Sequence, residues 1–453
     1  METKMKKVEK LSQSVTLKAV IIVILTLFLL IPSIMVQDLI RERQYRSTET
    51  IEKINEKWSN AQTLCAPVLS IPLTTTYKTS DNKTAYEHHT LNVAPETLNI
   101  ETELYPEERH YGIYKTILYK SDIDISGTFE LGDFVVVNSV LHWDNAYMRL
   151  GLTDLRGITN NISFKLNDQS YEAEAGGTYD EYLGRELQIT LGDSLFKTSN
   201  KTISFNCKLN LNGSESINFI PLGKTTNVHV TGAWNAPGYV GNFSPETIPS
   251  EGFDATWNIL RYNRNIPDTW IDNNIDNFYD STFGVNLVNT VDHYQQNMRS
   301  AKYAFMFIAL TFVVFFFVEI LTKKKIHPIQ YLLVGIALIL FYSLLLSISE
   351  QLSFGLAYLI ASIAIIGLIT AYAFSIFKNK SQTAMLTVIL CLLYVFLYVV
   401  LQLEDIALLI GSIGLFIILG IIMYFSRKIN WYKQEELPGT EGLNSNSYEN
   451  ESI

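Results

Sequence analysis

The chain has 453 residues, a hydrophobic content of 48% and a formal net charge of −10. The charge is unevenly spread, because residues 41–300 hold 21 Lys and Arg against 33 Asp and Glu, a net charge of −12. Such an acidic region disfavours nucleic acid and anionic headgroups as its partners. Long uncharged runs outside it exclude an ordinary soluble protein and indicate an integral membrane protein.

Six apolar runs are each about long enough to cross a bilayer core, which needs about 20 apolar residues at about 1.5 Å per residue. One run lies near the start of the chain, and five lie in its last third. They cover residues 19–37, 303–318 with an extension to 322, 326–349, 351–377, 381–403 and 406–426. The sequence therefore predicts an α-helical membrane protein with six spans.

The first run follows a basic start, so it could be read as a cleaved signal peptide. Its apolar stretch is longer than a usual signal core, and residues 32–37 lack the small-x-small pattern of a cleavage site. We therefore expect an uncleaved anchor helix at residues 19–37, preceded by a tail of residues 1–18.

Basic residues between the later runs indicate how the chain crosses the membrane. Cytoplasmic loops are richer in Lys and Arg than outside loops. The basic positions are Lys323, Lys324, Lys325, Lys378, Lys380, Arg427, Lys428 and Lys433, and the turns between them carry Glu350, Glu404 and Asp405. This pattern predicts a cytoplasmic C-terminus. Counting back through six spans places the N-terminus in the cytoplasm and residues 38–300 outside.

The outside region changes from a helical pattern to a strand pattern. Residues 38–60 suit an amphipathic helix that leaves the membrane, and residues 285–298 are expected to form a helix that runs into the second span. Apolar and polar side chains alternate, or nearly so, in residues 135–143, 187–191, 203–211, 226–234 and 253–259. So many short strands predict a β-rich domain of antiparallel sheets, most simply sandwich-like.

The rest of the chain divides simply. Residues 301–426 hold the five remaining apolar runs and are expected to form a five-helix transmembrane bundle. Residues 427–453 are polar and are expected to form a disordered cytoplasmic tail.

Five segments together resemble one protein family. They are residues 58–64 with 67–69, 151–157, 252–257, 301–319, and 327–335 with 347–350. This combination resembles the CreD family, bacterial inner-membrane proteins associated with cell-envelope integrity. The likeness runs from Leu17 to the sixth apolar run and excludes only the polar tails. One departure is Cys65-Ala66-Pro67, where the family pattern has a Gly before the Pro.

The resemblance implies a multi-pass protein of the bacterial inner membrane, with residues 38–300 in the periplasm. It also implies a link to envelope stress, colicin tolerance and a two-component regulon that answers to cell-wall damage. It carries over no catalytic mechanism and no cofactor.

Two polar residues, His327 and Glu350, interrupt the apolar helices. They bracket the third span, 23 residues apart, so about 35 Å separates them and they cannot share a site. His327 precedes Pro328 and suits a helix start, which is the alternative to a functional role. Glu350 is either a solvated turn charge or a docking contact for the outside domain.

Three further residues of the apolar runs are candidates for docking or anchoring. Gln330 and Tyr331 belong to the same segment as His327. Glu319 lies four residues before Lys323, the favourable order for an ion pair within a helix, so anchoring is its expected role. The middle of each run carries no charge, which argues against coupled ion transport because transporters place ionisable groups inside their bundles.

Catalytic and metal-binding patterns are weak in this sequence. Ser194 and Lys197 have the Ser-x-x-Lys spacing, but no Lys-Thr-Gly accompanies them. His88 and His89 are neighbours on an expected strand and would point to opposite faces, so they make a poor metal pair. We therefore predict no catalytic residue, no cofactor and no metal site.

Two cysteines lie in the outside domain, where disulfides can form. Cys207 falls on the apolar side of its expected strand, which favours burial as a small hydrophobic residue. A disulfide between Cys65 and Cys207 stays open as the alternative.

These observations predict a non-enzymatic inner-membrane protein that supports cell envelope integrity or the stress response. Its periplasmic domain would bind or sense an envelope component, and its partners would be the lipid bilayer and an unidentified molecule or protein in the periplasm. The alternative is a transporter or lipid-handling protein that works through the helical bundle. A hydrolase outside the membrane is a third and weaker hypothesis.

Overall fold

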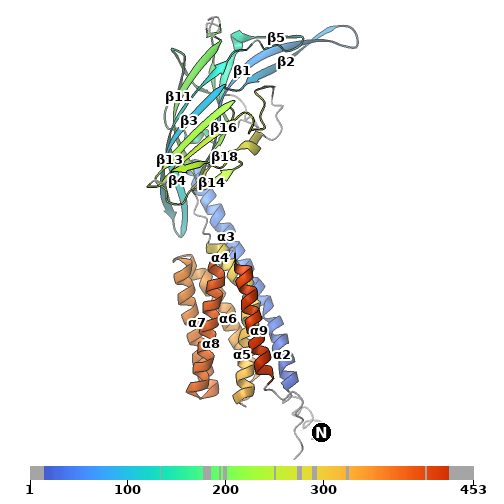
Figure 1. Ribbon diagram of the computed structural model, residues 1–453, viewed down its shortest axis with the longest axis vertical. Helices are drawn as coiled ribbons and strands as arrows, with labels where there is room; N and C mark the ends of the chain where they lie inside the picture. The colour runs from blue at the N-terminus through green and yellow to red at the C-terminus, as the bar shows by residue number, and fades with distance from the viewer. Residues whose placement is uncertain are drawn as a thin grey trace, which may run out of the picture. The chain divides into compact units, whose positions relative to one another are not determined.

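The computed structural model describes residues 15–132, 134–176, 185–192, 195–196, 201–248, 251–272, 278–287, 293–322, 326–403 and 406–427. The chain divides into two compact units (Figure 1). The helical unit comprises Met1–Arg43 and His293–Ile453, and the β unit comprises Gln44–Asp292. Some residues named in the predictions above lie outside the described ones: Lys323–Lys325, Glu404, Asp405, Ser194, Lys197, and residues 1–14 and 428–453 of the two tails.

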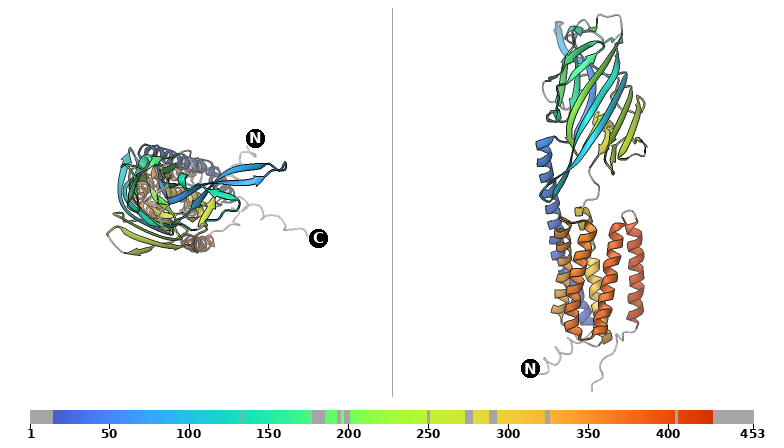
Figure 2. Two further views of the ribbon diagram at one scale, coloured as in Figure 1. Left: turned by 90° about the horizontal axis from the view of Figure 1, so that it is seen from above. Right: turned by 90° about the vertical axis from the view of Figure 1, so that its left-hand side faces the viewer.

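Long helices make up the helical unit, and Figure 2 shows them lying side by side. Their bounds are α2 Val15–Phe28, α3 Leu30–Trp58, α4 His293–Lys302, α5 Ala304–Thr322, α6 Pro328–Ser349, α7 Phe354–Phe377, α8 Lys380–Gln402 and α9 Ala407–Ser426. A helix bonds its own backbone groups internally, which a chain in hydrocarbon requires. The helix that the sequence predicts at residues 38–60 is the second half of α3, which ends at Trp58.

Among the described residues, four helices are long and apolar enough to cross a membrane. They are the stretch Leu17–Trp58 through α2 and α3, and then α6, α7 and α8. Helices α4 and α5 make a fifth span if the pair, which is bent by 45°, is counted as one. The apolar part of α9, Leu409–Tyr424, is shorter. Several membrane-length helices are therefore present, and the sixth span stays a prediction.

The helix predicted at residues 285–298 is wrong in its first part. Phe283–Asn286 form strand β18, and the helix begins only at His293. Phe283, Gly284 and Val285 are all buried, which suits a strand paired on both sides, with β12 and β14. The helix also does not run straight on, because a bend separates α4 from α5.

Aromatic side chains fill the middle of the bundle. The Phe341 ring of α6 contacts Tyr358 of α7 and Tyr394 of α8, with ring centroids 5.4 and 5.0 Å apart. Gly335 of α6 lets the N-terminal helices approach, since a Cβ there would lie 2.1 Å from Leu29 Cδ1. These contacts join the first membrane segment to the later helices.

The β unit contains two sheets whose buried residues form one hydrophobic core. Within the described residues, the first sheet has ten strands, in the order β14-β18-β12-β1-β6-β10-β9 with β2, β5 and β17 beside this path. Their bounds are β1 Gln62–Lys78, β2 Thr84–Val93, β5 Ser139–Leu141, β6 Tyr147–Leu152, β9 Glu174–Ala175, β10 Arg185–Thr190, β12 Ser216–Ile220, β14 Gly238–Gly241, β17 Thr269–Ile271 and β18 Phe283–Asn286. Beyond β5, strands β1 and β2 continue as a hairpin (Figure 1).

The second sheet has eight strands within the described residues, in the order β15-β16-β13-β3-β4-β11-β7-β8. Their bounds are β3 Thr97–Tyr111, β4 Tyr114–Glu130, β7 Ser163–Leu166, β8 Gln169–Glu172, β11 Thr202–Ser214, β13 Thr225–Gly232, β15 Glu246–Ile248 and β16 Phe253–Leu260. The alternation predicted at residues 203–211 is confirmed, because the apolar side chains of β11 are buried and those between them are less so.

Two details of the predicted sheets are wrong. The pairing is not wholly antiparallel, since β1 pairs with β12 and β13 pairs with β3 in parallel. Parallel neighbours need a long crossover, and many residues separate the strands of both pairs. Residues 135–143 also form only the short strand β5, followed by a 3-10 helix at Trp143–Asn145. Val135 and Val137 are 86% and 77% exposed, whereas Val136, Leu141 and Trp143 are partly buried against the core.

Candidate functional site

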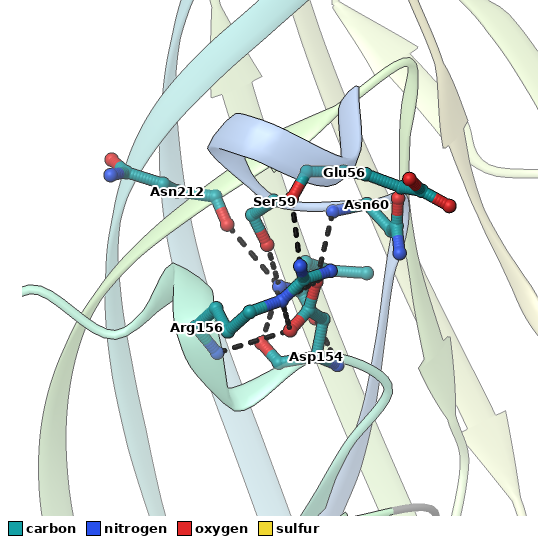
Figure 3. A network of polar contacts seen from close by, with 7 residues as sticks. Glu56, Ser59, Asn60, Asp154, Arg156 and Asn212 are labelled. Carbon is teal, nitrogen blue, oxygen red and sulfur yellow. Dashed lines mark hydrogen bonds and ion pairs between the residues drawn. The ribbon is translucent and has the colours of Figure 1, made fainter. Parts of the chain in front are cut away.

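The end of α3 is tied to the β unit by a network of polar contacts (Figure 3). Asp154 follows β6, and its carboxylate accepts hydrogen bonds from the Asn60 backbone N–H at 3.2 Å and from Arg156 Nη2 at 2.7 Å. Arg156 in turn donates from Nη1 to the carbonyl oxygen of Glu56 at 2.7 Å. That carbonyl belongs to the last turn of α3, where the helix leaves its backbone acceptors without an internal donor. The arginine therefore caps the helix and holds the acidic residue at once.

Gln62, the first residue of β1, completes this network. Its Nε2 atom lies 2.8 Å from Ser59 Oγ, 2.8 Å from the Asp154 carbonyl oxygen and 3.2 Å from the Asn212 carbonyl oxygen. Its Oε1 atom accepts from the Asp154 backbone N–H at 3.2 Å. The Gln62 side chain is fully buried, so these contacts replace the water that the amide would otherwise bind.

The charge of Asp154 is stabilised by these contacts. Burial raises the pKa of the carboxyl group, but the Arg156 side chain and the backbone N–H groups of Asn60 and Arg156 outweigh it, so the pKa of Asp154 is below its usual value. A carboxyl group with a lowered folded-state pKa stabilises the fold above its unfolded-state pKa. This contribution is lost as the pH falls through the folded-state pKa.

Glu350 lies at the C-terminal end of α6, against the two helices that connect to the β unit. Its side chain is 9% exposed, 3.8 Å from Arg43 Nη1 of α3, and it accepts a hydrogen bond of 3.4 Å from the Tyr294 hydroxyl of α4. Beside it, Asn297 Nδ2 donates to Ser349 Oγ at 2.7 Å. Glu350 is thus not a solvated turn charge, and the contacts seen here lie within the helical unit. A docking role toward the β unit stays a hypothesis.

Glu319 forms a second polar cluster, near the C-terminal end of α5 and the N-terminal end of α6. It is 4% exposed and is paired with Lys18 of α2. It also accepts hydrogen bonds from the Tyr331 hydroxyl of α6 at 2.9 Å and from the Ile326 backbone N–H at 3.1 Å. The sequence pointed to Lys323 as its partner, which lies outside the described residues. The observed side-chain contacts connect three helices, α2, α5 and α6.

His327 and Gln330 form a capping box at the start of α6. The Ile329 backbone N–H donates to His327 Nδ1 at 3.3 Å, and the His327 backbone N–H donates to Gln330 Oε1 at 2.9 Å. Pro328 occupies the first turn, where its missing N–H leaves no bond unmade. These contacts match the helix-start interpretation of His327, and any docking role for the pair stays a hypothesis.

The two cysteines of the β unit are both buried, in different sheets. Cys65 lies on β1 and Cys207 on β11, and no disulfide joins them in the structure. Burial raises the pKa of the Cys207 thiol to about 12, so the thiolate needed for disulfide exchange is disfavoured. The interpretation of Cys207 as a small core residue accounts for its position.

Residues 14–432 match the family described as inner membrane protein CreD. The inner membrane protein CreD of Escherichia coli (strain K12) is 31% identical over 420 residues, which cover 90% of this chain and 91% of that protein. The chain belongs to the CreD family. The resemblance inferred from the sequence is therefore confirmed, as is its assignment to inner-membrane proteins with transmembrane helices and a β-rich domain.

Two of the segments that carry the CreD resemblance, residues 58–64 and 151–157, meet in the network of Figure 3. The sequence identified both segments but gave no sign that they touch, because 90 residues separate their hydrogen-bonding partners Thr63 and Thr153. The buried Gln62, polar at the start of an apolar strand, was the one local sign of a network at this point.

An acidic groove on the second sheet was missed by the sequence reasoning. It has a volume of about 490 Å³ and is lined by residues of β3, β4, β11 and β13. Glu101 lies opposite Asp124, and Glu103 lies opposite Asp122, so like charges face each other across two strands. His229 and Lys208 are the next residues in the first of these rows. No group of three or more possible ligands for a metal ion occurs in the part of the chain that the structure describes.

His229 offers a test of the charges in this groove. Its Nδ1 atom lies 2.6 Å from Glu101 Oε2, and its Nε2 atom lies 3.0 Å from Asp254 Oδ1. Partial burial lowers its pKa, but bonds to Glu101 and Asp254 raise it more, so the pKa is above its usual value. The protonated ring therefore stabilises the fold fully below the unfolded-state pKa of about 6.5.

We expect His229→Gln to lower the thermal stability of the β unit more at pH 5.5 than at pH 9. The stability that protonated His229 gives to the parent protein should be lost as the pH rises through the folded-state pKa of His229. Thermal melts followed by circular dichroism measure the difference. His110→Gln, at the exposed end of β3, controls for the loss of an imidazole. An equal loss at both pH values would contradict the charge-based account.

Proposed function

We propose that this CreD-family protein supports cell envelope integrity or the stress response without catalysis, through a β-rich domain that binds or senses an envelope component. One observation carries the proposal. Helix α3 holds Arg43, which contacts Glu350, and also Glu56, which Arg156 caps. Both residues belong to the helix Leu30–Trp58. A ligand that shifts the sheets would act on α3 directly.

The arrangement in the membrane is part of this proposal. Residues 1–18 would form a cytoplasmic tail, 19–37 an anchor, 38–300 a sandwich-like periplasmic domain, 301–426 a five-helix bundle, and 427–453 a cytoplasmic tail. Six spans would then place both termini in the cytoplasm. The alternation of basic and acidic turns supports this orientation.

Thiol labelling tests the arrangement. In a background without the native cysteines, Lys83→Cys, Lys208→Cys and Gln351→Cys should react with a membrane-impermeant reagent added to intact cells after the outer membrane is permeabilised. Asn379→Cys should react only after the inner membrane is opened. All four positions are exposed, so access to the reagent depends on the side of the membrane. Labelling of Asn379→Cys in sealed cells would overturn the orientation.

Replacing Glu350 by Gln tests the function itself. The change removes the charge that faces Arg43, and a pair of this exposure contributes about 1 kcal/mol or less to the packing of α3 on α6. We expect a deletion strain complemented with Glu350→Gln to survive detergent or cell-wall antibiotic stress less well than one complemented with the parent.

Ser343→Ala and Ser347→Ala, on the same helix as Glu350, are the matched controls. They should leave survival unchanged, because the middle of the spans carries no charge and so offers no ion path to lose. If both serine variants failed at normal expression while Glu350→Gln behaved as the parent, the bundle would be the working part. The alternative of a transporter or lipid-handling protein would then replace the proposal.

One observation favours that alternative in its lipid-handling form. The bundle has a wholly apolar groove between α5, α8 and α9, which suits hydrocarbon rather than an ion.

A further inference from the structure

The groove between α5, α8 and α9 has a volume of about 570 Å³. Every residue that lines it is Leu, Ile, Val, Phe, Met or Gly. Val314 of α5, Ile389 of α8 and Ile417 of α9 lie on its three sides. These side chains form no hydrogen bonds with water, and inside a membrane they would contact the hydrocarbon of lipid acyl chains.

Loose packing of α9 leaves this space open. Helix α9 approaches α8 at Gly414, where a Cβ would lie 2.3 Å from the Phe396 ring. Among the α9 side chains whose exposure the structure describes, none is buried. The helix is therefore held at a close backbone contact and does not fill the space beside α5.

The groove extends toward a basic end of the bundle. It reaches Val318 near the end of α5, Met385 near the start of α8 and Ile422 near the end of α9. The exposed side chains at that end include Lys380 and Arg427. Each is five residues from a lining residue, Met385 and Ile422 respectively, which corresponds to about 7.5 Å along the helix.

We propose that this groove binds an acyl chain of an anionic phospholipid, whose phosphate group lies against Lys380 and Arg427. Basic residues between membrane helices bind anionic headgroups, and each contributes a factor of about five to the attraction. The apolar lining accounts for the acyl chain, and the basic end selects the headgroup. This site goes beyond the function proposed for the β unit and does not depend on it.

Photo-crosslinking of the full chain tests the proposal. The protein is reconstituted into phosphatidylcholine vesicles that contain either phosphatidylglycerol or phosphatidylcholine with the same photoreactive acyl chain. Adducts in the groove segments of α5, α8 and α9 should be about fivefold or more frequent with phosphatidylglycerol. The double variant Lys380→Gln/Arg427→Gln, changed only at exposed positions, should bring this ratio close to one.

Filling the groove provides the second arm. Ile389→Trp should reduce adducts from both lipids several-fold, whereas Val388→Trp, its neighbour on the exposed face and outside the groove, should not. Equal labelling by the two lipids in the parent would overturn the choice of an anionic ligand. An Ile389→Trp effect no larger than that of Val388→Trp would overturn the site. Crosslinks between two copies through these segments would assign the groove to a second chain instead.

Discussion

Replacing Gly157 by Ala is expected to destabilise the β unit strongly. Gly157 is buried, and an added Cβ would lie 2.3 Å from the Asn212 carbonyl oxygen, 2.7 Å from Gln62 Nε2 and 2.8 Å from Ser59 Oγ, all of them atoms of the polar network described above. The methyl group must therefore push β11 backbone or the Gln62 amide away. Overpacking costs about 1–3 kcal/mol, and a buried amide that loses its partners costs about 1–3 kcal/mol more.

The expected result is a fall of about 2–5 kcal/mol in the free energy of unfolding, or at least about 5 °C in Tm. Thermal melts of the full chain in detergent, followed by the circular dichroism of the strands, measure it. Gly132→Ala is the matched control, since its nearest neighbour is a Phe134 ring atom 3.8 Å away, and it should change stability by about 0.5 kcal/mol or less. Equal Tm values for the two variants would show that the polar network at the end of α3 accommodates the added methyl group without loss of stability.

The parts of the fold that follow from local pattern could be predicted from the sequence. The long apolar runs reflect a membrane environment. The alternation in β11 and β16 reflects a core on one side of each strand. Val285 shows the limit of this reasoning. Its neighbours suit either a helix or a strand, and the choice depends on pairing with β12, which lies far away in the sequence.

The same limit applies to the polar sites. Glu319 was expected to pair with Lys323, whereas the observed partner Lys18 is 301 residues away, so no spacing rule could name it. Glu350 was identified because it is a charged residue at the end of an apolar segment. Its contacts with Arg43 and Tyr294 form only when α3 and α4 pack on α6. The local sequence therefore identifies charged residues that need a partner in the fold. Which residue becomes the partner depends on tertiary packing.

A buried ion pair in the first sheet gives the second large expected effect. Arg149 of β6 and Glu186 of β10 are 2.9 Å apart, with side chains 9% and 10% exposed. Arg149 also donates to Ser70 Oγ at 2.9 Å and to Asn92 Oδ1 at 2.8 Å. Glu186→Gln removes the charge that compensates the buried guanidinium, and breaking such a pair costs about 3–5 kcal/mol.

Chemical unfolding of the full chain measures the loss, and two further variants give it a physical interpretation. Glu49→Gln removes one partner of the exposed pair with Lys53 and should change stability far less than Glu186→Gln, because solvent screens that pair. Arg149→Met/Glu186→Met removes both buried charges together, so it should be less destabilised than Glu186→Gln, because neither charge is left without its partner. If Glu186→Gln cost no more than Glu49→Gln, the guanidinium would be adequately solvated without the carboxylate. The two side chains would then stabilise the β6–β10 pairing by packing and not by their charges.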